Sequence, residues 1–248
     1  MMLEVRNVEK RFDQQAVLKG ISLDVNKGDV VAILGPSGSG KTTFLRCLNF
    51  LERADGGTLN LDGEQCELKT AGRKQISRLR RKTAFVFQNY NLFLNKTVLQ
   101  NVMLGLTAGM GMNSREAKEI AVSALQKVGM ADKLDSYPSQ LSGGQQQRAA
   151  IARGLATSPE IIYFDEPTSA LDPELIGEVL NVMRRLAEEG MTMLVVTHEM
   201  DFARNVSNKV LFMENGEVIE SGSSRDFFAH PSHPRTREFI RSILDARK

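Results

Sequence analysis

The sequence lacks any long hydrophobic run. In its 248 residues no apolar stretch approaches the roughly 18 to 20 residues that a membrane-spanning helix requires. Residues 1–12 alternate apolar and polar side chains and do not have the pattern of a secretion signal. We therefore expect any role at a membrane to depend on a partner protein.

Cysteine is scarce as well. The two cysteines, Cys47 and Cys66, have a spacing that fits neither a zinc site nor a redox pair, so we predict two free thiols in a reducing compartment. His230 and His233 lie beside prolines and are predicted to be solvated loop residues, not metal ligands.

An excess of charge of one sign is also missing. The net charge is +2, which is too small to indicate a nucleic-acid or anionic-lipid partner by itself. Residues 73–82 are the exception, with six cations in ten residues. This segment could contact phosphates, but it has no interleaved aromatic residues, and we favour a solvated helix face.

What the sequence does contain is a mixture of strand and helix patterns typical of one large α/β domain. Alternating segments predict antiparallel strands with one solvated face, and short apolar runs predict buried parallel strands. Helical periodicity dominates between residues 90 and 157, where Ala117, Ala121 and Leu125 share one face. Asn215-Gly216 separates two alternating runs and predicts a hairpin.

A glycine-rich motif carries the first chemical signal. Residues 35–42, GPSGSGKT, match G-x-x-x-x-G-K-[ST] and lie between a buried strand pattern and a helix pattern. Glycines allow backbone N–H groups to surround phosphate oxygens, and the helix N-terminus adds the positive end of a dipole. We expect Lys41 to contact the β- and γ-phosphates of a nucleotide, and Thr42 to offer a hydroxyl ligand to Mg²⁺.

A second strand pattern ends in two acids, Asp165 and Glu166, the carboxylates that a Walker B element requires. Asp165 would hold the metal through water. Glu166 could polarise the attacking water, although a carboxylate at a strand end is as often only a cap for the next turn.

A second glycine-rich turn, Leu141-Ser142-Gly143-Gly144-Gln145, opens another helix pattern and offers a second phosphate half-site. Written as LSGGQ, this turn is the signature of the ABC family of ATPases, and the chain resembles that family over essentially its whole length. Gln88 resembles the Q-loop, Ser169-Ala170-Leu171-Asp172 the D-loop, and His198 the switch histidine. Phe12 lies where the family usually places an adenine-stacking aromatic, although a core-filling role is the alternative.

The resemblance implies a fold and a site. The fold is α/β: a P-loop NTPase core with a mixed sheet, an antiparallel β flank and an α-helical subdomain, approximately 90–157, inserted in a single domain 1–248. ATP and Mg²⁺ are the implied cofactors. The implied catalytic residues are Glu166, His198 and Lys41, and the implied metal ligands are Thr42, Gln88 and Asp165. The implied nucleotide-binding residues are Phe12, Gly35, Pro36, Ser37, Gly38, Ser39, Gly40, Lys41, Thr42, Thr43, Gln88, Ser142, Gly143, Gly144, Gln145 and Asp172.

The resemblance also implies an assembly. Two cassettes would meet head to tail, so that ATP lies between the Gly35–Thr43 loop of one chain and the Ser142–Gln145 turn of the other. With one cassette in this chain, that means a homodimer on the cytoplasmic face of the membrane. Its partners would be two integral-membrane permease subunits and, indirectly, an extracytoplasmic substrate-binding protein. Tyr90, Leu92, Phe93 and Leu94 could anchor a permease helix, or could simply pack the helical subdomain.

Several stretches, including VVTHEMDFAR, are similar to cassettes that import polar amino acids, and PRTREFIRSIL is similar to those serving cystine. Residues 91–98 lack the proline and histidine that this group usually has before the threonine, so this segment does not indicate which membrane partner the chain binds. The alternatives are an exporter or lipoprotein-release ATPase and, more distantly, a soluble ABC ATPase acting on nucleic acid, whose second cassette or long coiled coil is absent here. A GTPase is disfavoured because Asn95-Lys96-Thr97-Val98 lacks the aspartate of N-K-x-D. We expect no nucleic-acid partner.

Overall fold

The computed structural model describes residues 1–245, which form two compact units. The first unit comprises Met1–Arg80 together with the described residues from Gly190 onward, and the second comprises Arg81–Glu189. Within the described part of the chain, no helix has the length and apolar character needed to cross a membrane.

An antiparallel sheet forms one part of the first unit. Leu3 and Val5 are buried and alternate with polar neighbours, as the sequence pattern predicts for a sheet with one solvated face, and an irregularity at Asn7 shifts the alternation so that Val8 is buried too. The strand order is β2-β1-β4-β5. Its members are β1 (Leu3–Phe12), β2 (Gln15–Val25), β4 (Gly56–Leu61) and β5 (Glu64–Glu67).

A mostly parallel group of strands forms the other part. β3 (Val30–Leu34) pairs in parallel with both β8 (Thr192–Val196) and β9 (Lys209–Glu214). Every residue of β3 and β8 is buried, which explains why their sequences are continuous apolar runs. β9 forms a hairpin with β10 (Glu217–Ser223) through Asn215 and Gly216, both at positive φ, so the predicted hairpin is confirmed.

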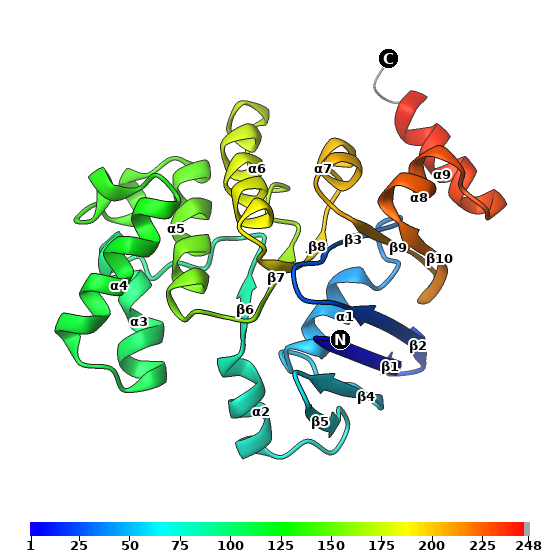
Figure 1. Ribbon diagram of the computed structural model, residues 1–248, viewed down its shortest axis with the longest axis horizontal. Helices are drawn as coiled ribbons and strands as arrows, with labels where there is room; N and C mark the ends of the chain where they lie inside the picture. The colour runs from blue at the N-terminus through cyan, green and yellow to red at the C-terminus, as the bar shows by residue number, and fades with distance from the viewer. Residues whose placement is uncertain (246–248) are drawn as a thin grey trace. The chain divides into compact units, whose positions relative to one another are not determined.

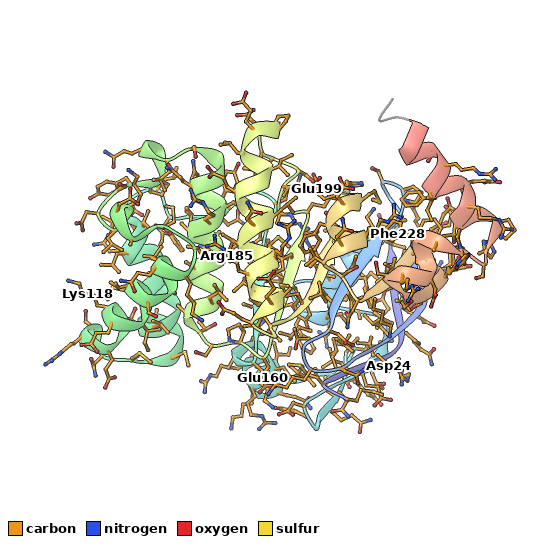
Figure 2. All side chains as sticks on the ribbon, turned by 45° about the horizontal axis from the view of Figure 1, so that its top comes forward. Asp24, Lys118, Glu160, Arg185, Glu199 and Phe228 are labelled. Atoms are coloured by element: carbon orange, nitrogen blue, oxygen red, sulfur yellow. The ribbon has the colours of Figure 1, made fainter. Side chains whose placement is uncertain are left out.

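Five helices begin in the first unit: α1 (Lys41–Leu48), α2 (Arg73–Arg81), α7 (Met200–Asn205), α8 (Ser224–Ala229) and α9 (Pro234–Asp245). α8 contributes Phe227 to a core cluster that also includes Phe212, and Phe228 and Phe239 pack against this cluster. Figure 2 labels Phe228 on α8. The guanidinium of Arg235 on α9 bonds both carboxylate oxygens of Glu214, at 2.7 to 2.9 Å. This ion pair fixes α9 to the end of β9.

The cations of α2 are partly used inside the first unit. Arg78 pairs with Glu64 at 2.8 Å, and Arg80 donates to the carbonyls of Asn49 and Phe50. Only Leu79 of this helix is buried, which fits the solvated face that the sequence favours.

The second unit contains a parallel pair of strands and a group of helices. β6 (Thr83–Val86) pairs in parallel with β7 (Ile161–Asp165). Helices α3, α4 and α5 lie side by side (Figure 1), with Ala117, Ala121 and Leu125 buried on the predicted face and Lys118 pointing outward (Figure 2). The helices are α3 (Val98–Leu104), α4 (Ser114–Lys127), α5 (Gly143–Ala156) and α6 (Pro173–Glu188), with short turns at Gly105–Gly109, Ala131–Lys133 and Pro138–Gln140.

The predicted fold class is confirmed: the chain is α/β, with buried parallel strands, an antiparallel sheet and a helical group. The helices α3 to α5 lie inside the predicted insertion at residues 90–157. The assignment of the chain to one domain stays a prediction.

Candidate nucleotide-binding and hydrolysis site

The loop between β3 and α1 has the backbone shape of a phosphate-binding loop. Gly35 follows β3 at φ 147°, and a Cβ there would lie 2.0 Å from the carbonyl oxygen of Met213. Gly40 caps α1 at φ 95°, and a Cβ there would lie 2.8 Å from the carbonyl oxygen of Val17. Both positions therefore require glycine, because a side chain would meet backbone atoms of neighbouring strands.

Lys41 brings a cation to this loop. The residue is 4% exposed, and its Nζ donates to the carbonyls of Gly35 and Pro36 at 2.8 Å each. The Oγ of Ser39 is buried without a hydrogen-bond partner among the described residues. An ammonium group, an unpaired hydroxyl and the N-terminus of an eight-residue helix at one loop fit a phosphate group.

Two neighbouring segments hold the loop in place. The N–H of Gly216 donates to the carbonyl of Ser39 at 3.3 Å, and the N–H of Lys19 donates to the carbonyl of Gly216 at 2.9 Å. The β9–β10 turn and β2 therefore pack directly on the phosphate loop. Phe12 ends β1, pairs with Gln15 across the turn to β2, and is 44% exposed. The core-filling alternative for Phe12 requires a buried ring and does not fit.

His198 lies at the same edge of the parallel strands as the phosphate loop. It follows β8, which pairs in register with β3, with Ile33 opposite Val196. The carboxyl ends of β3 and β8 thus deliver Gly35 and His198 side by side, at the edge where ligands bind in open α/β sheets. His198 is exposed.

The two predicted acids lie at the end of β7 in the second unit. Asp165 is the last residue of the strand and is 3% exposed. Glu166 has φ 48°, a left-handed conformation that is uncommon outside glycine and concentrates at functional sites. Its carboxylate accepts a hydrogen bond of 2.9 Å from Ser169 Oγ. The turn that follows leads to Asp172, which precedes α6 as its N-cap residue.

The LSGGQ turn forms the N-terminus of α5. The hydroxyl of Ser142 accepts from the N–H of Gln145 at 3.3 Å, and the Gln145 side chain accepts from the N–H of Ser142 at 3.0 Å. This reciprocal capping box explains the serine and the glutamine three residues apart. Gly143 and Gly144 form the first two positions of the helix.

The segment around Gln88, residues 87–91, is fixed to α5 by Gln147 and Arg153, which the sequence did not indicate as functional residues. Gln147 donates to the carbonyl of Phe87 at 3.2 Å, and Arg153 donates to the carbonyls of Tyr90 and Asn91. Burial lowers the pKa of Arg153. Tyr90 and Asn91 both have positive φ, and these side-chain bonds hold them there. No spacing in the sequence points to these contacts.

Tyr90 connects three of the predicted motifs within the second unit. The hydroxyl of Tyr90 donates to the carbonyl of Ala170 at 3.0 Å. A Cβ on Gly143 would lie 2.7 Å from the hydroxyl oxygen of Tyr90. The Q-loop segment, the D-loop and the LSGGQ turn are thus contiguous. Gln88 itself is exposed.

Phe93 and Leu94 are 48% and 73% exposed. Exposure of both side chains is compatible with the predicted anchoring of a permease helix, which stays a prediction.

The comparison with known proteins identifies the family. Residues 18–169 match the model of the family described as ABC transporter. This chain belongs to that family. The sequence-based prediction of an ABC ATPase is therefore confirmed, and the roles of its individual motifs stay predictions.

Full-length relatives within the ABC transporter family are similar to this chain. The L-cystine import ATP-binding protein TcyN of Bacillus subtilis is 53% identical over 242 residues, which cover 98% of this chain and 93% of that protein. The nopaline permease ATP-binding protein P of Agrobacterium fabrum is 54% identical, covering 98% and 97%. Among solved structures, the dimeric post-hydrolysis state of the ATP-binding cassette MJ0796, bound to ADP and Pi, is 34% identical with a TM-score of 0.79, covering 90% and 99%.

Both cysteines of this ABC protein are free, as predicted, and the structure buries both of them. Burial raises the pKa of Cys47 to about 12 and that of Cys66 to about 11. Both thiols are therefore protonated at neutral pH and poorly nucleophilic. Among the described residues, no three His, Cys, Asp or Glu side chains gather as a metal site.

Proposed function

We propose that this chain is the ATP-hydrolysing subunit of an ABC importer that takes up a polar amino acid. The observation that carries the proposal is the loop of residues 35–41, whose shape fits phosphate at the carboxyl edge of β3. Relatives that match this chain over nearly its whole length are named as subunits of a cystine importer and of a nopaline permease. The similarity is as high to a nopaline permease subunit as to a cystine one, so it favours the class of polar amino acids over any single member.

The residues divide the work of ATP hydrolysis between them. Phe12 would stack the adenine, and residues 35–43 would surround the phosphates. Lys41 would neutralise charge that develops on the β- and γ-phosphate oxygens. The exposed imidazole of His198, at the same strand edge, would position the γ-phosphate and the attacking water.

Glu166 would act as the general base. Its carboxylate accepts a hydrogen bond from Ser169 Oγ, which would orient it for proton transfer from a water molecule. Thr42, Gln88 and Asp165 offer the oxygen ligands that Mg²⁺ prefers and would hold the ion. Bound Mg²⁺ would supply charge neutralisation across the β- and γ-phosphates.

The proposed assembly is a homodimer at the cytoplasmic face of the membrane. A similar cassette forms a dimer with ADP and Pi, and the turn of Ser142–Gln145 offers helix N–H groups for a second contact to phosphate. Asp172 would lie near that interface. Exposed Phe93 and Leu94 would anchor a short helix from each of two permease subunits, which in turn would receive substrate from an extracytoplasmic binding protein.

The test uses Glu166→Gln in the purified chain. The amide cannot accept the proton of the attacking water, whereas the phosphate loop is unchanged, so we expect ATP binding with hydrolysis reduced by roughly 10²-fold or more and a dimer that accumulates with ATP. Light scattering and phosphate release measure both quantities. Glu188→Gln, an exposed carboxamide change on α6, is the matched control. A Glu166→Gln chain that hydrolyses ATP at the unmodified rate would remove Glu166 from the mechanism.

A further inference from the structure

Lys10 is a buried lysine that none of the predicted motifs uses. The residue is 8% exposed in β1. Its Nζ forms an ion pair of 2.8 Å with Glu52 and donates to the carbonyl of Arg53, also at 2.8 Å. Burial lowers the pKa of Lys10, but the hydrogen bond and charge of Glu52 raise it, and the net pKa lies above its ordinary value. Lys10 therefore carries a fixed positive charge at neutral pH.

That charge lies on an aromatic face. Lys10 and Phe12 are two residues apart in β1, so their side chains share one side of the strand. The Nζ of Lys10 lies 4.7 Å from the centroid of the Phe12 ring, within the range of a cation–π interaction. Phe12 nevertheless remains 44% exposed. The cation covers one face of the ring, and much of the rest faces outward.

The strand register places this pair beside the phosphate loop. Lys10 is opposite Leu18 and Arg11 is opposite Ala16, which leaves Val17 as the extra residue of a bulge in β2. The carbonyl of Val17 is the backbone atom that a Cβ on Gly40 would meet at 2.8 Å. Glu52 and Arg53, the two partners of Lys10, follow α1, which begins at Lys41. Lys10 is thus tied to segments on both sides of the loop.

We propose that Lys10 is a positioning residue for the nucleotide base: its ammonium group holds the inner face of Phe12, so that the outer face is presented to the base. A cation on one face draws the π electrons of the ring toward itself, and an electron-rich purine then stacks more favourably on the opposite face. Fixing the ring also reduces the entropy that a mobile aromatic side chain would lose on stacking. This inference rests on the proposed ATP-binding function and adds a residue to it.

The competing explanation is that Lys10 only neutralises Glu52 and stabilises the fold. The two explanations differ in which part of the nucleotide they affect. A residue that positions the base changes the affinity for ATP and leaves that for inorganic tripolyphosphate, which has no base, unchanged. A residue that supports the loop or the fold changes both.

The experiment measures the affinities of the full-length protein for ATP and for tripolyphosphate by calorimetry. Lys10→Met keeps the length of the side chain and removes the charge. We expect it to weaken ATP binding by about two- to five-fold, the range of an exposed cation–π contact, with tripolyphosphate binding unchanged. Lys10→Arg keeps a cation and should restore the affinity for ATP. Lys27→Met, at an exposed lysine in the turn between β2 and β3, is the matched control and should change neither affinity.

Two further variants keep the test decisive. Lys10→Met/Glu52→Gln removes both members of the ion pair, which separates the loss of the cation–π contact from the cost of leaving a carboxylate unpaired. In a Phe12→Leu background, Lys10→Met should have no further effect on ATP affinity, because the ring through which it acts is missing.

Three results would overturn the proposal: unchanged ATP affinity in Lys10→Met, equal losses for ATP and tripolyphosphate, or the same loss in the Phe12→Leu background. Failure of the proposed function is distinguishable, since the unmodified chain would then bind ATP no better than tripolyphosphate or would bind neither.

Discussion

Gly35 is the position at which the structure makes its sharpest steric prediction. In Gly35→Ala the new methyl group would start 2.0 Å from the carbonyl oxygen of Met213 and 3.1 Å from Ser39 Oγ. The first contact is with backbone on β9, which cannot rotate away as a side chain could. The loop must therefore move away from β9 by more than an ångström, or the strand must.

Two costs add up. A left-handed or similarly unusual φ costs an alanine about 1–2 kcal/mol. Forcing a methyl group into a packed site costs about 1–3 kcal/mol more. We expect Gly35→Ala to lower the free energy of unfolding by about 2–5 kcal/mol and to weaken ATP binding, because the displaced loop no longer directs its N–H groups to one point.

Gly63→Ala is the matched control. Gly63 has φ +79°, but a Cβ there meets nothing within 4 Å, so this variant carries the conformational cost without the clash. Urea unfolding and calorimetric ATP titration of both variants isolate the contribution of the clash. Since each kcal/mol shifts the melting temperature by roughly 2–4 °C in a chain of this size, the two variants should differ by several degrees. Equal stability and equal ATP affinity would refute the steric argument and the loop geometry on which it rests.

Two further predictions concern other contacts. Asn101 is fully buried, and its side chain forms hydrogen bonds with the backbone of Phe93, Lys96 and Thr97. Asn101→Ala should therefore lower the free energy of unfolding by about 2–4 kcal/mol and accelerate amide exchange at residues 93–97. Asn95→Ala, at an exposed position, should do neither, and unchanged exchange in Asn101→Ala would contradict this prediction. The hydrogen bond and charge of Arg235 hold the pKa of Glu214 below its ordinary value, so the stability advantage over Glu214→Gln should be complete above that ordinary value and shrink as the pH falls through the lowered pKa. Urea unfolding that shows an advantage growing as the pH falls would count against the pairing.

Motif-bearing parts of the fold could be predicted from the sequence because their spacing dictates local geometry. A buried strand before Gly35 and a helix after Gly40 leave few ways to arrange the loop between them. Asn215-Gly216 specifies its hairpin equally locally, because both residues tolerate positive φ. The alternating pattern of β1 indicated its buried face, and the glycine-rich turn of residues 141–145 marked the start of α5.

Contacts between distant segments could not be predicted in this way. Asn101 and Arg153 have ordinary positions in helical patterns, and nothing in their neighbours shows that they bond backbone carbonyls of residues 90–97. Lys10 looks like one of the solvated residues of an alternating strand, yet Glu52 and Phe12 bury its charge. In each case the partner is chosen by tertiary packing, which periodicity does not encode.

ATP hydrolysis by this chain should drive uptake of a polar amino acid. The most direct measurement is uptake of labelled amino acids, cystine first and then a polar panel, in cells that carry either the unmodified chain or Glu166→Gln. We expect uptake of at least one polar amino acid to be lost with Glu166→Gln and retained with Glu188→Gln. Unchanged uptake across the panel, together with a loss of efflux, would contradict import and favour an export cassette.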